Sequence, residues 1–160
     1  MEEEKDLTES EPRRRFMKHN TPSLTVDAVI LFKNKLVLVK RKYPPYEGKF
    51  ALPGGFVEIG ESTEKAASRE AFEETGLSVE ILKLIGVYSD PERDPRRHTV
   101  SVCYLAKGYG DLKSGSDADA VELFELDSIP ELAFDHNKMI NDAKSDINAV
   151  LYQMQKYDVS

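Results

Sequence analysis

Hydrophobic and polar residues alternate in several short segments of the chain, and this period of two is typical of β-strands. In segment 23–32, SLTVDAVILF, one face carries Leu24, Val26, Ala28, Ile30 and Phe32. A turn at Asn34 follows, so segment 35–42 is predicted to form a hairpin with it. Further strands are predicted in segments 51–58, 79–90, 97–110 and 121–129.

Two other segments have apolar residues at helical spacing. The first spans Thr63 to Thr75, with Ser62 as the predicted N-cap and Gly76 as the residue that ends the helix. The second lies near the C-terminus, from about His136 to Tyr157. Its apolar residues are Met139, Ile140, Ala143, Ile147, Val150, Leu151 and Met154, a stripe that predicts core packing.

This order of elements predicts an α/β fold. The chain is rich in strands, has one early and one late helix, and lacks regular βαβ alternation, which indicates a mixed sheet between two helices. Residues 1–22 are polar and charged without a usable period, so we expect a flexible leader there. Residues 23–160 are expected to form one domain, which the length of 160 residues also favours.

Composition narrows the class of protein. The net charge of −7 argues against binding to nucleic acid or to an anionic membrane, since both partners attract a basic surface. The chain has one cysteine, Cys103, and therefore forms no internal disulfide, which fits a reducing compartment. No apolar run approaches the length of a membrane span, and the N-terminus is too charged for a signal peptide. These features predict a cytoplasmic protein.

Three glutamates are concentrated at the end of the first predicted helix. Glu70, Glu73 and Glu74 have i, i+3 and i+4 spacing, at which like charges repel by roughly 0.2–0.5 kcal/mol per pair. Such a group is most often a solvated face, but convergent carboxylates also bind hard divalent cations. The pair Gly54–Gly55 permits a close backbone approach, so a main-chain carbonyl could complete a metal site.

The residues around these glutamates resemble the Nudix box, Gly-x5-Glu-x7-Arg-Glu-U-x-Glu-Glu-x-Gly-U. The fixed positions are Gly55, Glu61, Arg69, Glu70, Glu73, Glu74 and Gly76, with Ala71 and Leu77 at the apolar positions. The resemblance extends from about Leu24 to the C-terminal helix. It implies a Nudix α/β/α sandwich that hydrolyses a nucleoside diphosphate linked to another group, using Mg²⁺ or Mn²⁺.

The resemblance also implies roles for individual residues. The Gly54 carbonyl and the carboxylates of Glu70, Glu73 and Glu74 would bind the metal, while Glu61 and Arg69 would hold the loop and helix together. The catalytic base would be Glu73 or Glu74, or an acid outside the box. The candidates outside the box are Asp117, Asp119 and Glu122, each of which is as typical of a solvated loop or strand edge.

The segment 86–98, GVYSDPERDPRRH, resembles that of ADP-ribose pyrophosphatases, although Arg97 stands where glycine is usual. The resemblance implies hydrolysis of ADP-ribose to AMP and ribose 5-phosphate. The arginines of this segment suit phosphates, but they are equally compatible with a role in solubility. The expected substrate contacts are Arg41, Tyr46, Pro91, Arg93, Arg96 and Phe134.

Two alternatives remain open. One is a pyrophosphohydrolase of oxidised nucleoside triphosphates, whose base pocket leaves weak marks in sequence. The other is a module that senses ADP-ribose without hydrolysing it. Sensors of this type usually have an eroded box and an added winged-helix domain, so the intact box and the single helical segment after Asp127 favour an enzyme. Many relatives form homodimers, and a homodimer is therefore one expectation here.

Overall fold

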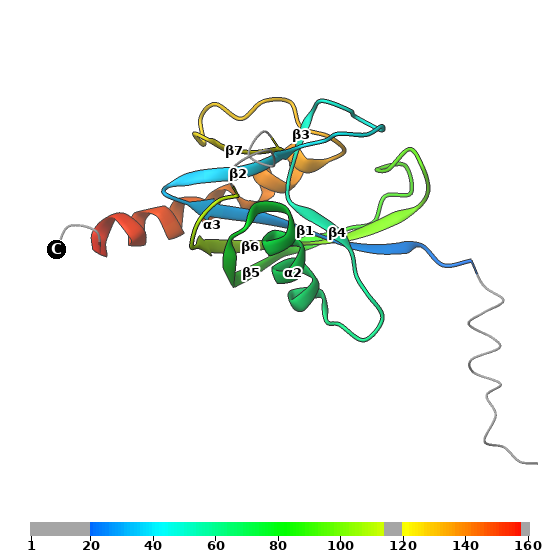
Figure 1. Ribbon diagram of the computed structural model, residues 1–160, viewed down its shortest axis with the longest axis horizontal. Coiled ribbons are helices and arrows are strands. Elements are labelled where there is room, and N and C mark those ends of the chain that lie inside the picture. The colour runs from blue at the N-terminus through cyan, green and yellow to red at the C-terminus, as the bar shows by residue number, and fades with distance from the viewer. Residues whose placement is uncertain (1–19, 114–119, 158–160) are drawn as a thin grey trace, which may run out of the picture.

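The computed structural model describes residues 20–113 and 120–157, and these form a mixed β-sheet with helices packed against it (Figure 1). The strands are β1 (Ser23–Phe32), β2 (Lys35–Lys40), β3 (Phe50–Ala51), β4 (Gly54–Phe56), β5 (Ser78–Tyr88), β6 (Thr99–Tyr109) and β7 (Val121–Phe124). The helices are α2 (Thr63–Thr75) and α3 (His136–Tyr157). No helix within the described ranges is long and apolar enough to cross a membrane.

The sheet has the strand order β3-β2-β1-β6-β5, with β1 and β6 parallel and the other pairs antiparallel. Two strands, β2 and β4, pair with different parts of one edge of β1. Its end pairs with β2 at Leu31 and Phe32, whereas its first half pairs with β4 at Thr25, Val26 and Asp27. Strand β7 pairs with the other edge of β2, so β3 and β1 lie along the same edge of β2. The chain therefore crosses from β2 to β1 over the two residues Leu52 and Pro53, and the sheet divides there.

Helix α2 begins and ends where the sequence predicts. The Ser62 side chain accepts a hydrogen bond from the Lys65 N–H, and Gly76 ends the helix with φ of 81°. That left-handed conformation favours glycine because it has no Cβ. The buried face of α2 consists of Ala66, Ala67, Ala71 and Thr75. These small side chains let the helix lie close to the sheet.

Helix α3 packs on the opposite face of the sheet. Its buried residues Met139, Ala143 and Ile147 contact the cluster that contains Val29 and Leu31 of β1. The alternate residues of β1, Ala28 and Ile30, face Ala71 of α2 instead. Because successive residues of a strand point to opposite faces, β1 is buried on both sides. The predicted mixed sheet between two helices is confirmed.

Two predicted strands differ from the structure. Segment 51–58 forms two short strands, β3 and β4, because Leu52 and Pro53 cross between different partners. Segment 121–129 is a strand only to Phe124. The chain then turns, with the Ser128 N–H donating to the Glu125 carbonyl.

Candidate active site

Arg69 joins α2 to the loop that precedes it. Its Nε and Nη2 donate to the two carboxylate oxygens of Glu61 at 3.1 and 2.7 Å, and Nη2 also donates to the Phe56 carbonyl at 3.0 Å. Glu61 additionally accepts the Glu58 N–H at 2.8 Å. The hydrogen bonds from Arg69 lower the pKa of Glu61, and those to Glu61 raise the pKa of Arg69. This geometry supports the expectation that Glu61 and Arg69 fix the loop–helix arrangement.

The three clustered glutamates have different partners. Arg69 Nη1 donates to Glu70 Oε1 at 2.9 Å and to Glu73 Oε2 at 3.2 Å. Glu74 instead accepts the Gly54 N–H at 3.0 Å. Within residues 20–113 and 120–157, no group of three acids, histidines or cysteines is arranged to hold a metal ion. The donor oxygens suit a hard cation, but their side chains point to Arg69 and Gly54 rather than to one common centre.

The electrostatics of these acids nevertheless favour a cation. Burial raises the pKa of Glu74 to about 8, partly offset by the Gly54 N–H and reinforced by the charges of Glu70 and Asp27. Burial also raises the pKa of Glu70 despite its hydrogen bond from Arg69. The positive charge near each carboxylate therefore does not fully offset its burial. A divalent ion would supply that charge, so the residues fit the metal that the sequence predicts.

The glycine pair is required by close packing. A Cβ on Gly54 would lie 2.2 Å from the Val26 carbonyl oxygen, and one on Gly55 would lie 2.4 Å from Glu70 Oε1. A side chain at position 54 would collide with the backbone of β1, and one at position 55 would displace the Glu70 carboxylate. The two glycines therefore bring the backbone of β4 directly against the acids of α2.

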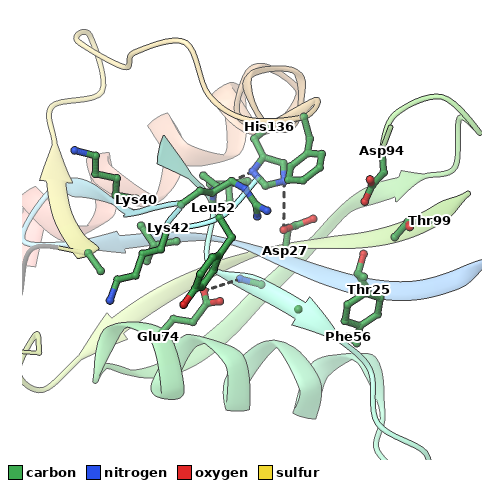
Figure 2. Close-up of a pocket in the computed structure, with 18 of the residues that line it drawn as sticks. Thr25, Asp27, Lys40, Lys42, Leu52, Phe56, Glu74, Asp94, Thr99 and His136 are labelled. Atoms are coloured by element: carbon green, nitrogen blue, oxygen red, sulfur yellow. Dashed lines mark hydrogen bonds and ion pairs between the residues drawn. The ribbon is translucent and has the colours of Figure 1, made fainter. Parts of the chain in front are cut away.

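A cavity of about 480 Å³ opens where the sheet divides, and Figure 2 shows Glu74, Asp27 and His136 around it. Glu73, Glu74 and Gly54 lie on its α2 side. The basic residues that line it are Lys40, Arg41, Lys42, Arg93, Arg96 and Lys113. One cavity thus combines carboxylates with several cations, an arrangement suited to a metal-bound polyphosphate.

The predicted site residues are distributed unevenly around this cavity. Those that line it are Gly54, Glu73, Glu74, Arg41, Arg93, Arg96 and Phe134. Those described outside its lining are Glu61, Arg69, Glu70, Tyr46, Pro91 and Glu122. Glu122 is exposed on β7, where it pairs with Leu38 of β2. Asp117 and Asp119 lie outside the described residues.

The three arginines of segment 93–97 occupy different environments. The Arg93 side chain is 4% exposed, and its Nε and Nη2 donate to Asp135 at 2.9 and 2.7 Å. Arg96 is about half exposed and donates to both carboxylate oxygens of Asp94. Arg97 is exposed, donates to the Ser23 hydroxyl and does not line the cavity. Arg93 is therefore part of the cavity wall, and Arg96 is the more accessible cation.

An aromatic and cationic group formed by Arg41, Arg96 and Phe134 also lines the cavity. The guanidinium groups of Arg41 and Arg96 lie 4.9 and 5.6 Å from the centre of the Phe134 ring. The Tyr46 ring packs edge-on against Phe134 with centroids 4.9 Å apart. Tyr46 and Phe134 both have positive φ, which is uncommon for such bulky residues. Tyr46 therefore supports Phe134, and this group can take up a planar or anionic part of a ligand.

Sequence reasoning did not single out Asp27, Asp94 or Thr99, which also line the cavity. Of these three, only Asp27 has a feature in the sequence that could have indicated a functional role, since it is a charged residue between apolar positions of a predicted strand. His136 was predicted only as the approximate start of the C-terminal helix, yet it is 3% exposed, hydrogen-bonded and part of the cavity lining.

Comparisons with known proteins agree with this geometry. The family model of the NUDIX domain matches residues 21–143. An ADP-ribose pyrophosphatase of Methanocaldococcus jannaschii is 51% identical over 122 residues, which are 76% of this chain and 72% of that protein.

Two solved structures have a similar fold. A MutT/nudix family protein from Enterococcus faecalis has a TM-score of 0.72 and 34% identity, covering 82% of this chain and 64% of that chain, so this protein spans less than two thirds of it. The NUDIX domain of Shewanella oneidensis NrtR, complexed with ADP ribose, has a TM-score of 0.72 and 29% identity, covering 92% and 99%.

The raised pKa of Glu74 predicts how the stability of the metal-free protein depends on pH. Since the folded state favours the protonated acid, the stability this provides is present below the ordinary carboxyl pKa of about 4.5 and is lost as pH rises through about 8. The urea midpoint of metal-free protein should therefore fall between pH 5 and pH 8. Glu74→Gln should flatten that decline, whereas the exposed control Glu64→Gln should retain it. A decline of equal size in both variants would contradict the assignment to Glu74.

Proposed function

The chain belongs to the Nudix family, and from this premise we propose that it hydrolyses ADP-ribose to AMP and ribose 5-phosphate with the aid of a divalent metal ion. The observation that carries the proposal is the cavity, whose lining combines Glu73 and Glu74 of the box with the Arg41–Phe134–Arg96 group. A diphosphate bound at these acids would leave the rest of the nucleotide within the same cavity, where that group can contact it. The 51% identity to an ADP-ribose pyrophosphatase supports this choice of substrate.

We propose that the Gly54 carbonyl and the carboxylates of Glu70, Glu73 and Glu74 hold Mg²⁺ or Mn²⁺. Such an ion would offset the charge of the diphosphate and make a water molecule more acidic. The protein's own part is to bring β4 and the end of α2, which carry these residues, next to each other. Arg69 and Glu61 maintain the loop–helix geometry, and the glycine pair lets β4 approach the acids.

Hydrolysis adds water across the phosphorus–oxygen–phosphorus link. One oxygen–phosphorus bond forms, the bridging bond breaks, and the proton of the attacking water passes to a base. Among the described acids, Glu73 and Glu74 are the proposed bases because both line the cavity. The other described candidate, Glu122, is exposed on β7 outside that lining.

We also propose that Arg96 and Arg41, which line the same cavity, bind phosphate or ribose oxygens. Guanidinium groups donate in a planar fork that matches such oxygens. Phe134 would provide an apolar surface between them. Arg93 has less to offer a ligand directly, since Asp135 and the Thr99 carbonyl accept its hydrogen bonds.

A second candidate function is a sensor that binds ADP-ribose without hydrolysing it. The similarity to the NUDIX domain of NrtR, whose structure contains ADP ribose, favours this alternative. The complete box favours hydrolysis, because it retains every acid expected to hold the metal.

Several less specific expectations complete the proposal. We propose that residues 1–22 are a leader and that residues 23–160 form the Nudix domain. A homodimer is proposed by analogy with relatives. A cytoplasmic location is proposed because the sequence has a single cysteine, Cys103, and cannot form an internal disulfide, which fits a reducing compartment.

The first test compares four compounds at fixed Mg²⁺: ADP-ribose, NADH, a diadenosine polyphosphate and an oxidised dGTP. We expect the highest kcat/KM for ADP-ribose, with AMP and ribose 5-phosphate resolved as products by chromatography. Preference for the oxidised triphosphate would overturn the substrate but not the chemistry. Tight ADP-ribose binding without turnover of any compound would place the protein among the sensors.

Replacing a single carboxylate of the box by an uncharged amide should abolish most of the activity. We expect Glu73→Gln or Glu74→Gln to lower kcat by about 100-fold or more, because a proton acceptor or metal ligand is lost. Glu64→Gln, an exposed change in the first turn of α2, is the matched control and should behave as wild type. The measurement is steady-state AMP release, with circular dichroism to check folding. Unchanged kcat in both box variants would refute the catalytic assignment.

The two neighbouring exposed arginines offer a matched pair for substrate binding. Arg96→Ala should raise KM for ADP-ribose about tenfold, because a charge-assisted hydrogen bond contributes about 1.5–3 kcal/mol. Arg97→Ala should leave KM unchanged, since Arg97 donates to Ser23 outside the cavity lining. Initial-rate kinetics on both variants provide the measurement. An equal or larger rise in KM for the Arg97 variant would contradict the proposed contact.

A further inference from the structure

A largely buried polar network forms part of the cavity wall and includes Asp27, Arg93 and His136. His136, the first residue of α3, is 3% exposed and its Nδ1 accepts the Leu52 N–H at 3.0 Å. Its Nε2 lies 3.4 Å from Asp27 Oδ1 (Figure 2). The imidazole therefore connects the start of α3 both to the crossing between β3 and β4 and to β1.

These contacts determine the tautomer of His136. A ring nitrogen that accepts a hydrogen bond carries no proton, so the neutral ring must be protonated at Nε2. That N–H is directed to the carboxylate of Asp27. The two contacts thus use both nitrogens, each in the one role that the neutral tautomer allows.

The segment held by His136 leads directly to the expected metal ligand. Leu52 is followed by Pro53, which has no N–H, and then by Gly54. The Pro53 carbonyl accepts the Ala28 N–H at 2.9 Å, and the Gly54 N–H is donated to Glu74. Leu52 lies between β3 and β4, which pair with different strands. Its N–H is therefore donated to the His136 side chain and not to a neighbouring strand.

Asp27 contacts the same glycine from the side of β1. A Cβ on Gly54 would lie 2.5 Å from Asp27 Oδ1. Asp27 also accepts a hydrogen bond from Ser101, and its Oδ2 lies 4.0 Å from Nη2 of Arg93. Arg93 is fixed in turn by Asp135, the residue immediately before His136. The network therefore encloses Gly54 and has its own internal charge partners.

We propose that His136 is a positioning residue that holds the Leu52–Gly54 backbone so that the Gly54 carbonyl is placed for the metal ion. The inference rests on the proposed function, since it concerns the expected metal site. It assigns to α3 a second task besides packing its apolar face on the sheet. It also explains why a histidine with both nitrogens engaged is buried at the first residue of this helix.

Two substitutions separate the two contacts of the imidazole. In asparagine the side-chain oxygen is bonded to Cγ, as Nδ1 is in histidine, so His136→Asn retains an acceptor for the Leu52 N–H. In glutamine the amide lies one bond further out, so His136→Gln retains a partner for Asp27 but loses that acceptor. Asn137→Ala is the matched control. Asn137 accepts the Leu132 N–H at 2.8 Å and donates to the Pro130 carbonyl, without a hydrogen bond to the Leu52–Gly54 segment.

The first readout is Mn²⁺ affinity without substrate, measured by electron paramagnetic resonance on the full chain. Changes in residues that orient metal ligands typically cost 10–100-fold in affinity. We expect His136→Gln to weaken Mn²⁺ binding about tenfold, and His136→Asn to restore most of the affinity. Asn137→Ala should lower the melting temperature while leaving Mn²⁺ binding unchanged.

The second readout is nuclear magnetic resonance of the wild-type protein, which does not depend on any variant folding. A coupling across the hydrogen bond between the Leu52 amide nitrogen and His136 Nδ1 is expected, and its absence would overturn the inference. Equal Mn²⁺ affinity in wild type and His136→Gln would also overturn it, as would an equal loss in Asn137→Ala. Wild-type protein that binds no Mn²⁺ would instead overturn the proposed function itself, and this inference with it.

Discussion

The candidate site depends on holding three carboxylates together at the C-terminal end of one helix. Helix dipole and mutual repulsion both oppose this arrangement. In the described structure, Arg69 offsets the charge of Glu70 and Glu73, while Glu74 accepts the Gly54 N–H and has the charge of Lys113 nearby. These partners do not outweigh the burial of Glu74, whose pKa is raised. A cation bound by the acids, as proposed above, would offset this cost.

The cavity next to these acids is formed where the sheet divides. Because β1 pairs with β4 over its first half and with β2 at its end, the strands separate and the backbone of Leu52 and Pro53 bridges the gap. Gly54 is the point where this bridge contacts both β1 and α2. A side chain at that position would fill the space in which α2, β1 and β4 meet.

Local features of the site could be predicted from the sequence, whereas long-range contacts could not. The spacing of the box, Ser62 and Gly76 predicted α2 to the residue because caps and helical periodicity act over a few positions. Arg93 was expected to contact substrate, but its partner Asp135 comes from a distant segment that folding brings near. The partners of Asp27 and His136 also come from distant segments of the chain. Glu70 was predicted from spacing, yet its present contact with Arg69 depends on side-chain positions that spacing does not determine.

The charge distribution accounts for an acidic protein that accepts an anionic substrate. With a net charge of −7, the molecule as a whole repels a diphosphate. The basic residues that line the cavity reverse this locally, and several of them follow one another at the end of β2 in Lys40, Arg41 and Lys42. Dissolved salt screens the electrostatic effect of the distant acids beyond about 8–10 Å at physiological ionic strength. Close to the cavity, the potential is therefore determined mainly by the residues that line it. Binding would therefore depend on the cavity's own cations together with the metal ion, and little on the net charge.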